Sequence, residues 1–175
     1  MKNIKSIIVL SMVAMVLFST CQLKKEKITA QIKEAEKQLE TDYSQGKMQQ
    51  LVALYQEYAK TFPKDSTTAE YLFRSANMNM KLRKGNEALA DLNIIISKYP
   101  SYSLLPECYF LKGFIYEDVL YDIENAKNAY YEFVAAFPSH GLAIQASMAI
   151  ALLDKSEDEV NTMFRDPDIV VNELE

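Results

Sequence analysis

Three segments of the chain share one pattern of apolar positions, and each pattern ends in an aromatic residue followed by proline. In the middle segment these positions are Ala88, Leu92, Ile95, Ile96 and Tyr99. Their spacing is that of one face of an α-helix. Pro100 disfavours α geometry at the residue before it, so this helix is predicted to end near Tyr99. The corresponding positions of the other two segments are Leu51, Tyr55, Tyr58, Ala59 and Phe62, and Ala126, Tyr130, Phe133, Val134 and Phe137.

The three segments recur at a nearly constant interval. Their prolines lie 37 and 38 residues apart, and a small residue follows each proline after 13 residues. The prolines are Pro63, Pro100 and Pro138, and the small residues are Ala76, Gly113 and Ala151. A period of this length is the signature of helix pairs that stack into a solenoid. The sequence therefore predicts an all-α fold. Besides the helix that ends at Tyr99, it predicts helices at about 28–43, 47–62, 67–83, 103–121, 122–137, 142–153 and 156–164.

Local signals indicate where several of these helices begin or end. Gly85 stands where a residue in left-handed geometry would close the preceding helix. The segments 67–70 and 156–159 each begin with Ser or Thr and end with Glu, which is the spacing of a capping box. Ser103 and Asp122 are predicted N-caps.

Each repeat resembles a tetratricopeptide repeat (TPR), a pair of antiparallel helices A and B. The small residues named above correspond to helix A, Ala88 and Ala126 correspond to the small residue of helix B, and a proline ends each repeat. Leu51 departs from the small residue of helix B, and the period exceeds the family's usual length of about 34 residues. The resemblance implies a right-handed solenoid of about three and a half repeats within a domain at 28–165. A capping helix would close its C-terminal side, and a tail would follow at 166–175.

The N-terminal residues form a separate segment. Lys2 and Lys5 precede a largely apolar run at 7–18, which is typical of a secretory signal. Cys21 stands where a bacterial lipoprotein signal places its lipidated cysteine, and the segment resembles that class. An ordinary cleaved or uncleaved signal is the alternative. We expect a lipoprotein signal peptide at 1–20, followed by a lipidated Cys21 and a tether at 21–27. Gln22, in place of Asp, implies an outer-membrane anchor that faces the periplasm.

The charge of the chain argues against nucleic acid as a partner. The chain carries a formal charge of −5, and removal of residues 1–20, which hold two lysines and no acid, leaves 17 basic and 24 acidic residues. With Cys21 lipidated, Cys108 has no cysteine with which to form a disulfide within the chain. Its helical, apolar surroundings indicate an inert, packed thiol.

The sequence offers no pattern of catalytic or metal-binding residues, so we expect no enzyme activity, metal or cofactor. His140 is the single histidine, and its place in a turn predicts a solvated loop residue. The chain has no second ligand at a metal-binding spacing, no glycine-rich phosphate loop and no G-x-S-x-G motif. The adjacent carboxylates Glu117 and Asp118 fit a solvated helix face better than acid–base catalysis.

The TPR resemblance implies a concave groove lined by the A helices. The peptide-contacting positions of the family fall on Glu70, Phe73, Asn77, Met80 and Lys81, on Glu107, Phe110, Phe114, Glu117 and Asp118, and on Gln145, Met148, Leu152 and Lys155. Phe73, Phe110 and Met148 hold equivalent positions, so they would form a row. Such a row, edged by carboxylates, suits an apolar or basic segment or helix. Packing between helices remains the alternative role for Phe73, Phe110 and Phe114.

The sequence therefore predicts a non-enzymatic, lipid-anchored scaffold that binds a protein or peptide segment in this groove. Its repeats and signal resemble those of TPR lipoproteins such as the subunit of the outer-membrane β-barrel assembly machinery. The resemblance implies a role in outer-membrane protein assembly or envelope biogenesis. Two alternatives stay open: a self-associating structural adaptor, and an accessory subunit of an enzyme or of a glycan-handling complex.

Overall fold

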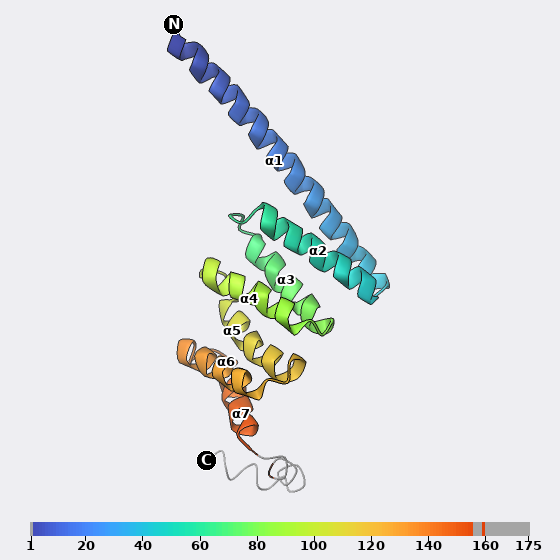
Figure 1. Ribbon diagram of the computed structural model, residues 1–175, viewed down its shortest axis with the longest axis vertical. Coiled ribbons are helices and arrows are strands. Elements are labelled where there is room, and N and C mark those ends of the chain that lie inside the picture. The colour runs from blue at the N-terminus through green and yellow to red at the C-terminus, as the bar shows by residue number, and fades with distance from the viewer. Residues whose placement is uncertain (1, 156–158, 160–175) are drawn as a thin grey trace. The chain divides into compact units, whose positions relative to one another are not determined.

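The computed structural model describes residues 2–155 and 159, and within them the chain is all-α, as predicted (Figure 1). The chain divides into two compact units, Met1–Leu82 and Arg83–Glu175, and we describe each by itself. The first unit contains α1 (Lys2–Thr41), α2 (Gln45–Thr61) and α3 (Thr68–Lys81). The second contains α4 (Gly85–Lys98), α5 (Leu105–Phe114), the π-helical segment η1 (Ile115–Val119), α6 (Ile123–Ala136) and α7 (Ala143–Leu153). The predicted helix 156–164, its capping box and the tail lie outside the described residues, apart from Glu159.

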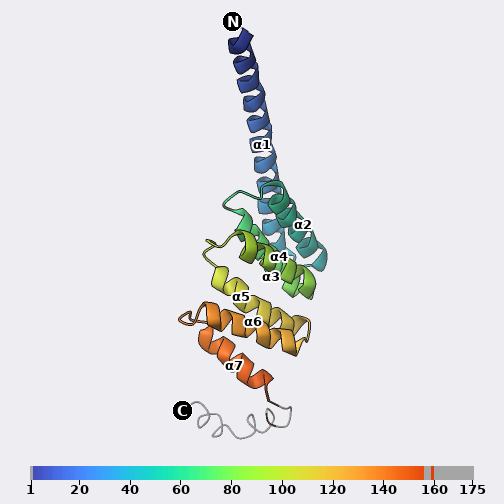
Figure 2. The same ribbon diagram turned by 60° about the vertical axis from the view of Figure 1, so that its left-hand side comes forward.

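In the first unit, α2 packs against both α1 and α3 (Figure 2). Ile32, Ala35 and Leu39 of α1 are buried, and so are the repeat positions of α2, which are Leu51, Tyr55 and Tyr58. Tyr71 of α3 contacts both tyrosine rings: it stacks on Tyr55 at 5.4 Å between ring centroids and meets Tyr58 edge-on at 4.7 Å. The core of this unit therefore consists of aliphatic residues from α1 and of tyrosine rings that join α2 to α3.

The helix α1 is longer than predicted, because it also includes the expected tether residues 22–27. No glycine or proline occurs between residues 2 and 41, and the tether is rich in good helix formers, so nothing in the sequence ends the helix there. Within the described residues, no helix combines the length and the apolar character needed to cross a membrane.

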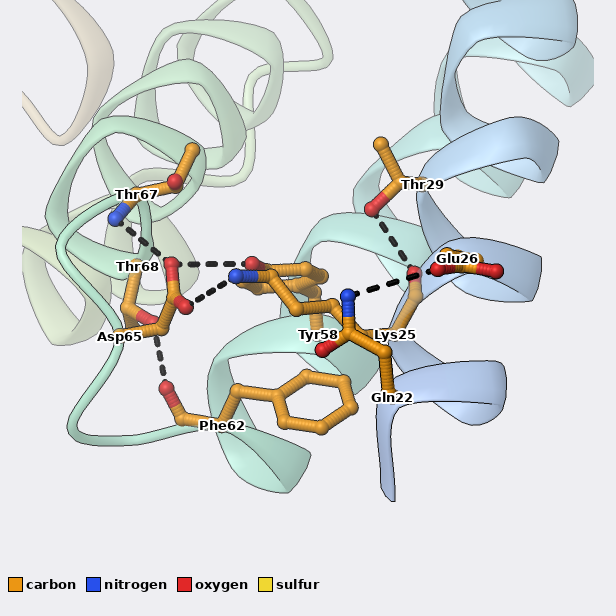
Figure 3. A network of polar contacts seen from close by, with 9 residues as sticks. All are labelled: Gln22, Lys25, Glu26, Thr29, Tyr58, Phe62, Asp65, Thr67 and Thr68. Carbon is orange, nitrogen blue, oxygen red and sulfur yellow. Dashed lines mark hydrogen bonds and ion pairs between the residues drawn. The ribbon is translucent and has the colours of Figure 1, made fainter. Parts of the chain in front are cut away.

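A polar network joins the segment that was predicted to be a tether to the turn between α2 and α3 (Figure 3). The Lys25 ammonium forms an ion pair with Asp65, and the Tyr58 hydroxyl donates to the same carboxylate at 3.0 Å. The backbone N–H of Thr67 also donates to Asp65, at 2.9 Å. Burial raises the pKa of Asp65, but these hydrogen bonds outweigh that effect and hold the pKa at about 2, below the ordinary 3.8. The carboxylate is therefore strongly stabilised in the folded chain.

Because of this network, the stability of the first unit should depend on pH. Because folding lowers the pKa of Asp65, its contribution is present above about pH 4 and is lost as the pH falls towards about 2. We expect Asp65→Asn to lower the free energy of unfolding by about 1–2 kcal/mol at neutral pH, and the difference to vanish in acid. Urea unfolding at a series of pH values measures this. Asp42→Asn, at a carboxylate that is 53% exposed, is the control with the smaller effect. A difference between wild type and Asp65→Asn that did not change with pH would contradict the prediction.

The three proline turns have the same local structure. The residue before each proline is the helix C-cap, with φ and ψ of −125° and 57° at Phe62, −129° and 58° at Tyr99, and −135° and 56° at Phe137. In each turn the same three backbone hydrogen bonds follow in the same order, with lengths of 2.8–3.1 Å. The repeated sequence pattern therefore corresponds to a repeated turn. Thr67 is an N-cap without a side-chain cap bond, so the predicted capping box at 67–70 is wrong, because Asp65 accepts the Thr67 N–H instead.

Two further predicted helix ends differ in detail. The left-handed residue that follows α3 is Arg83, with φ of 58°, and not Gly85, which is the first residue of α4. A Cβ atom on Gly85 would lie 2.6 Å from the Leu120 side chain, so this glycine permits close packing. The N-cap of α5 is Leu104 and not Ser103, whereas the Asp122 side chain accepts from the N–H of Asn125 at 3.1 Å, as expected for an N-cap.

The predicted helix 103–121 contains a π-helical turn, and the sequence period explains its position. From Ala76 to the left-handed Arg83 is seven residues, whereas from Gly113 to Tyr121, which is left-handed too, is eight. The additional residue falls within the stretch that contains η1, where the N–H of Leu120 donates to the carbonyl of Ile115 at 3.0 Å. A π-helical turn accommodates one extra residue in a helix. The π-helical turn at η1 therefore accounts for the change of period from 37 to 38 residues.

Candidate functional site

In the first unit, the predicted groove residues of α3 are half-buried. Phe73, Asn77 and Met80 are neither fully exposed nor part of the fully buried core. The Asn77 amide donates to the carbonyl of Phe73 at 2.8 Å, so one of its hydrogen-bonding groups is used within its own helix. This part of α3 offers mixed apolar and polar side chains and no concentrated charge.

Charged side chains on the same helix are joined to α1. The Arg74 guanidinium pairs with Glu70 at 2.6 Å and with Glu36 of α1 at 2.8 Å. The Glu36 carboxylate also accepts from the Tyr55 hydroxyl at 2.7 Å. Lys81 donates to the Tyr43 hydroxyl at 2.7 Å. Of the predicted groove residues, Glu70 thus pairs within α3, and Lys81 contacts the turn between α1 and α2.

In the second unit, Phe110 belongs to the packing between α5 and α6. Its ring lies 5.5 Å from that of Tyr130 and 5.7 Å from that of Phe133, measured between centroids. Gly113 faces Tyr130 as well, since a Cβ atom there would lie 2.5 Å from the ring. Phe110 and Gly113 are three residues apart and share one face of the helix, which is the face turned to α6. Of the two roles left open for Phe110, the structure favours packing.

Glu117 and Asp118 take part in specific contacts, so they are not simply a solvated helix face. The Tyr130 hydroxyl donates to Glu117 at 2.7 Å. Burial and, as the smaller effect, the Glu117 carboxylate raise the pKa of Tyr130 well above its ordinary value. Asp118 accepts from the Arg83 guanidinium at 2.7 Å, and the same guanidinium donates to the Tyr121 hydroxyl at 2.7 Å. Both carboxylates thus have structural partners, and Glu117 helps to hold α6 against the end of the α5–η1 segment.

Three apolar side chains remain exposed at predicted groove positions of the second unit. They are Phe114 of α5 at 37%, and Met148 and Leu152 of α7 at 45% and 40%. Ile144, which the groove assignment did not include, is 73% exposed. Ile144, Met148 and Leu152 are spaced i, i+4 and i+8, so they form one stripe along α7, which we call the α7 stripe. That spacing is readable in the sequence and could have revealed Ile144 as a member.

Of the two candidate reactive groups, Cys108 is buried and His140 is partly exposed. Cys108 is fully buried, and burial, with a contribution from Glu107, raises the pKa of its thiol to about 12, as expected for an inert thiol. His140 lies in a turn, as predicted, but its side chain is only 30% exposed: its ring meets Phe133 edge-on at 5.8 Å between centroids, and its Nε2 lies 3.8 Å from Glu107. The compact proline turn brings it against α5 and α6. In the described part of the chain, no cluster of His, Cys, Asp or Glu could hold a metal ion.

A shallow groove of about 410 Å³ lies between α1 and α2 in the first unit. Its lining is mostly amides and charged side chains, together with two alanines and one leucine. The lining residues are Lys27, Ala30, Gln31, Glu34, Ala35, Gln38, Gln50 and Leu54. No α3 residue predicted to bind peptides lines the groove, and its side chains form no catalytic arrangement.

Comparison with known proteins identifies no relative. No protein-family model matches the chain, and no curated protein is similar to it in sequence.

Proposed function

We propose that the chain is a non-enzymatic scaffold of the cell envelope, built as a right-handed TPR-like solenoid, that binds a protein or peptide segment through its A helices. The repeated proline turns and the close contact of Gly113 with Tyr130 support a repeat of helix pairs. In this proposal Cys21 carries a lipid that anchors the chain to the outer membrane, facing the periplasm. A part in outer-membrane protein assembly or envelope biogenesis fits such a position.

The observation that carries the binding proposal is the exposed apolar surface of the second unit. Phe114 and the α7 stripe lie on A helices, at or next to the positions expected to contact a ligand. Large apolar side chains left exposed together favour a protein-binding surface. A stripe with helical spacing suits an amphipathic helix or an extended apolar segment. Of the predicted row, Met148 belongs to this exposed surface, whereas Phe110 is occupied in packing.

The experiment is capture of a partner from envelope extracts with the tagged full-length chain. We expect Phe114→Ser/Met148→Ser to reduce capture of any specific partner about tenfold or more, because central apolar residues dominate binding energy. The matched control is Ile123→Ser/Tyr131→Ser, which changes two apolar residues of α6 that are 43% and 54% exposed. Circular dichroism should show both variants folded. Equal capture by wild type and both variants would refute the site.

The same variants separate a receptor from a self-associating adaptor. A receptor is expected to sediment as a monomer in the absence of its ligand. An adaptor would show a mass that rises with concentration, and the rise would be lost in Phe114→Ser/Met148→Ser. Flotation of the membrane fraction tests the anchor separately: Cys21→Ser should appear in the soluble fraction, and an unchanged membrane fraction would count against lipidation.

A further inference from the structure

One end of the first unit is rich in lysine, although the whole chain is acidic. Residues 22–27 and 60–66 hold five lysines and two carboxylates, a net charge of +3, whereas the chain as a whole carries −5. We call this surface the lysine-rich end. Its lysines are Lys24, Lys25 and Lys27 of α1, Lys60 of α2 and Lys64 of the following turn.

The fold brings these two segments together. The ion pair between Lys25 and Asp65 joins α1 to the turn between α2 and α3, although the two residues are 40 positions apart (Figure 3). The Tyr58 hydroxyl, from α2, reaches the same carboxylate. Lys24 is adjacent in sequence to Lys25, and Lys64 is adjacent to Asp65. The two lysine-containing segments therefore meet at one end of the unit.

The charges of this end are available to a ligand. Lys24, Lys27, Lys60 and Lys64 are exposed, and none of them makes an ion pair with another described residue. Only Lys25 is paired, with Asp65. After residue 27 the charge balance of α1 changes, because Lys33 and Lys37 are interleaved with three glutamates, Glu34, Glu36 and Glu40. The excess of lysine at 22–27 therefore does not continue along the rest of the helix.

An apolar side chain accompanies these charges. Leu23 is 64% exposed beside Lys24. Lysines beside an exposed apolar side chain attract anionic lipid headgroups, while that side chain can enter the interface.

We propose that the lysine-rich end lies on a bilayer surface and binds anionic phospholipid headgroups. This inference rests on the proposed attachment at Cys21 and specifies how the attached unit is oriented. The backbone of residue 21 is helical and lies four residues, about 6 Å, before Lys25 along α1. Because Lys25 is held to Asp65, an anchor at Cys21 would hold the turn between α2 and α3 at the membrane. The segment expected to be a tether at 21–27 is instead helical, and Lys25 joins it to the turn.

The absence of tryptophan from the chain allows a direct test. Single reporters, Ser66→Trp in the turn and Gly46→Trp near the start of α2, are placed in the full-length chain. Both positions are exposed, and a Cβ atom on Gly46 would meet nothing within 4 Å. Vesicles contain three parts phosphatidylcholine to one part phosphatidylglycerol, with a headgroup-linked nitroxide quencher. We expect strong quenching of the Ser66→Trp reporter and little quenching of the Gly46→Trp reporter. Equal quenching of the two reporters would overturn the orientation.

Charge-reversal variants test whether the lysines cause the contact with anionic vesicles. Lys24→Glu/Lys27→Glu should weaken the contact of the Ser66→Trp reporter with anionic vesicles about tenfold or more, since each lysine near an anionic surface contributes about fivefold. The matched control Lys33→Glu/Lys37→Glu, also on exposed positions of α1, should leave it unchanged. Quenching should fall at high salt and in vesicles of phosphatidylcholine alone. If both charge variants behave alike, or if lipid charge has no effect, headgroup binding is refuted and an acidic protein becomes the candidate ligand.

Failure of the anchor and failure of the surface can be told apart. Flotation with Cys21→Ser reports the anchor alone. If that variant detaches from membranes, the Ser66→Trp reporter in it should still be quenched by added anionic vesicles. Absence of that quenching would refute the lysine-rich end as a lipid-binding surface and leave the lipid anchor standing.

Discussion

Phe133→Ala is expected to lower the free energy of unfolding of the second unit by about 3–5 kcal/mol, the usual cost of removing a fully buried aromatic side chain. Phe133 has no exposed surface, and its ring contacts those of Phe110, Phe137 and His140 at centroid distances of 5.7–5.9 Å. Truncation would leave a cavity that these rings could fill only in part. Denaturant unfolding followed by circular dichroism measures the loss.

The control for this change is Phe114→Ala, on the neighbouring helix α5. Phe114 is 37% exposed, so its removal should cost about 1 kcal/mol or less. The two variants separate stability from binding: Phe133→Ala should unfold at a lower denaturant concentration than wild type, whereas Phe114→Ala should remain folded and bind its ligand less tightly. A cost at Phe133 as small as that at Phe114 would show that this ring is not part of a packed core.

Gly113→Ala is expected to destabilise the same unit by about 1–3 kcal/mol, although alanine is the better helix former. The added Cβ atom would lie 2.5 Å from the ring of Tyr130, which is itself 1% exposed and has no room to withdraw. Moving that ring would also strain its hydrogen bond to Glu117, at 2.7 Å. Overpacking should therefore outweigh the gain in helix propensity.

The same substitution at Gly46 should have the opposite sign. Gly46 lies in the first turn of α2, and a Cβ atom there would meet nothing within 4 Å. Gly46→Ala should stabilise the first unit by a few tenths of a kcal/mol, and by at most about 1 kcal/mol. The midpoints and slopes of urea unfolding for both variants, compared with wild type, decide the matter. Stabilisation by both would indicate that α5 and α6 are less closely packed at Gly113 than described.

The two variants also bear on the proposed binding surface. Gly113 and Phe110 turn one face of α5 towards α6, and this leaves Phe114 at the edge, where a ligand can reach it. Because Gly113 leaves room for the Tyr130 ring, Phe110 packs against α6 and Phe114 remains exposed. Changes at Gly113 should impair binding only through the packing of α5 on α6.

Local and periodic features of the fold could be predicted from the sequence alone. The proline turns at Phe62, Tyr99 and Phe137 occur where predicted, because proline restricts the residue before it whatever the rest of the chain does. The buried positions of α2, α4 and α6 follow from helical spacing, since one face of each helix must leave water. The prediction that Asp122 is an N-cap is confirmed, because an N-cap depends only on residues at its own end of the helix.

Only the tertiary structure decided the features that depend on residues far apart in the chain. Periodicity places Phe110 and Phe114 on nearly the same face of α5, and the contact of Gly113 with Tyr130 separates them into a packed and an exposed residue. The pairing of Lys25 with Asp65 spans 40 residues, so no local pattern could indicate that the tether residues belong to the fold. Helical spacing specifies which residues must be buried, but not which neighbour covers them, because that choice depends on the shapes of side chains that meet only when the chain has folded.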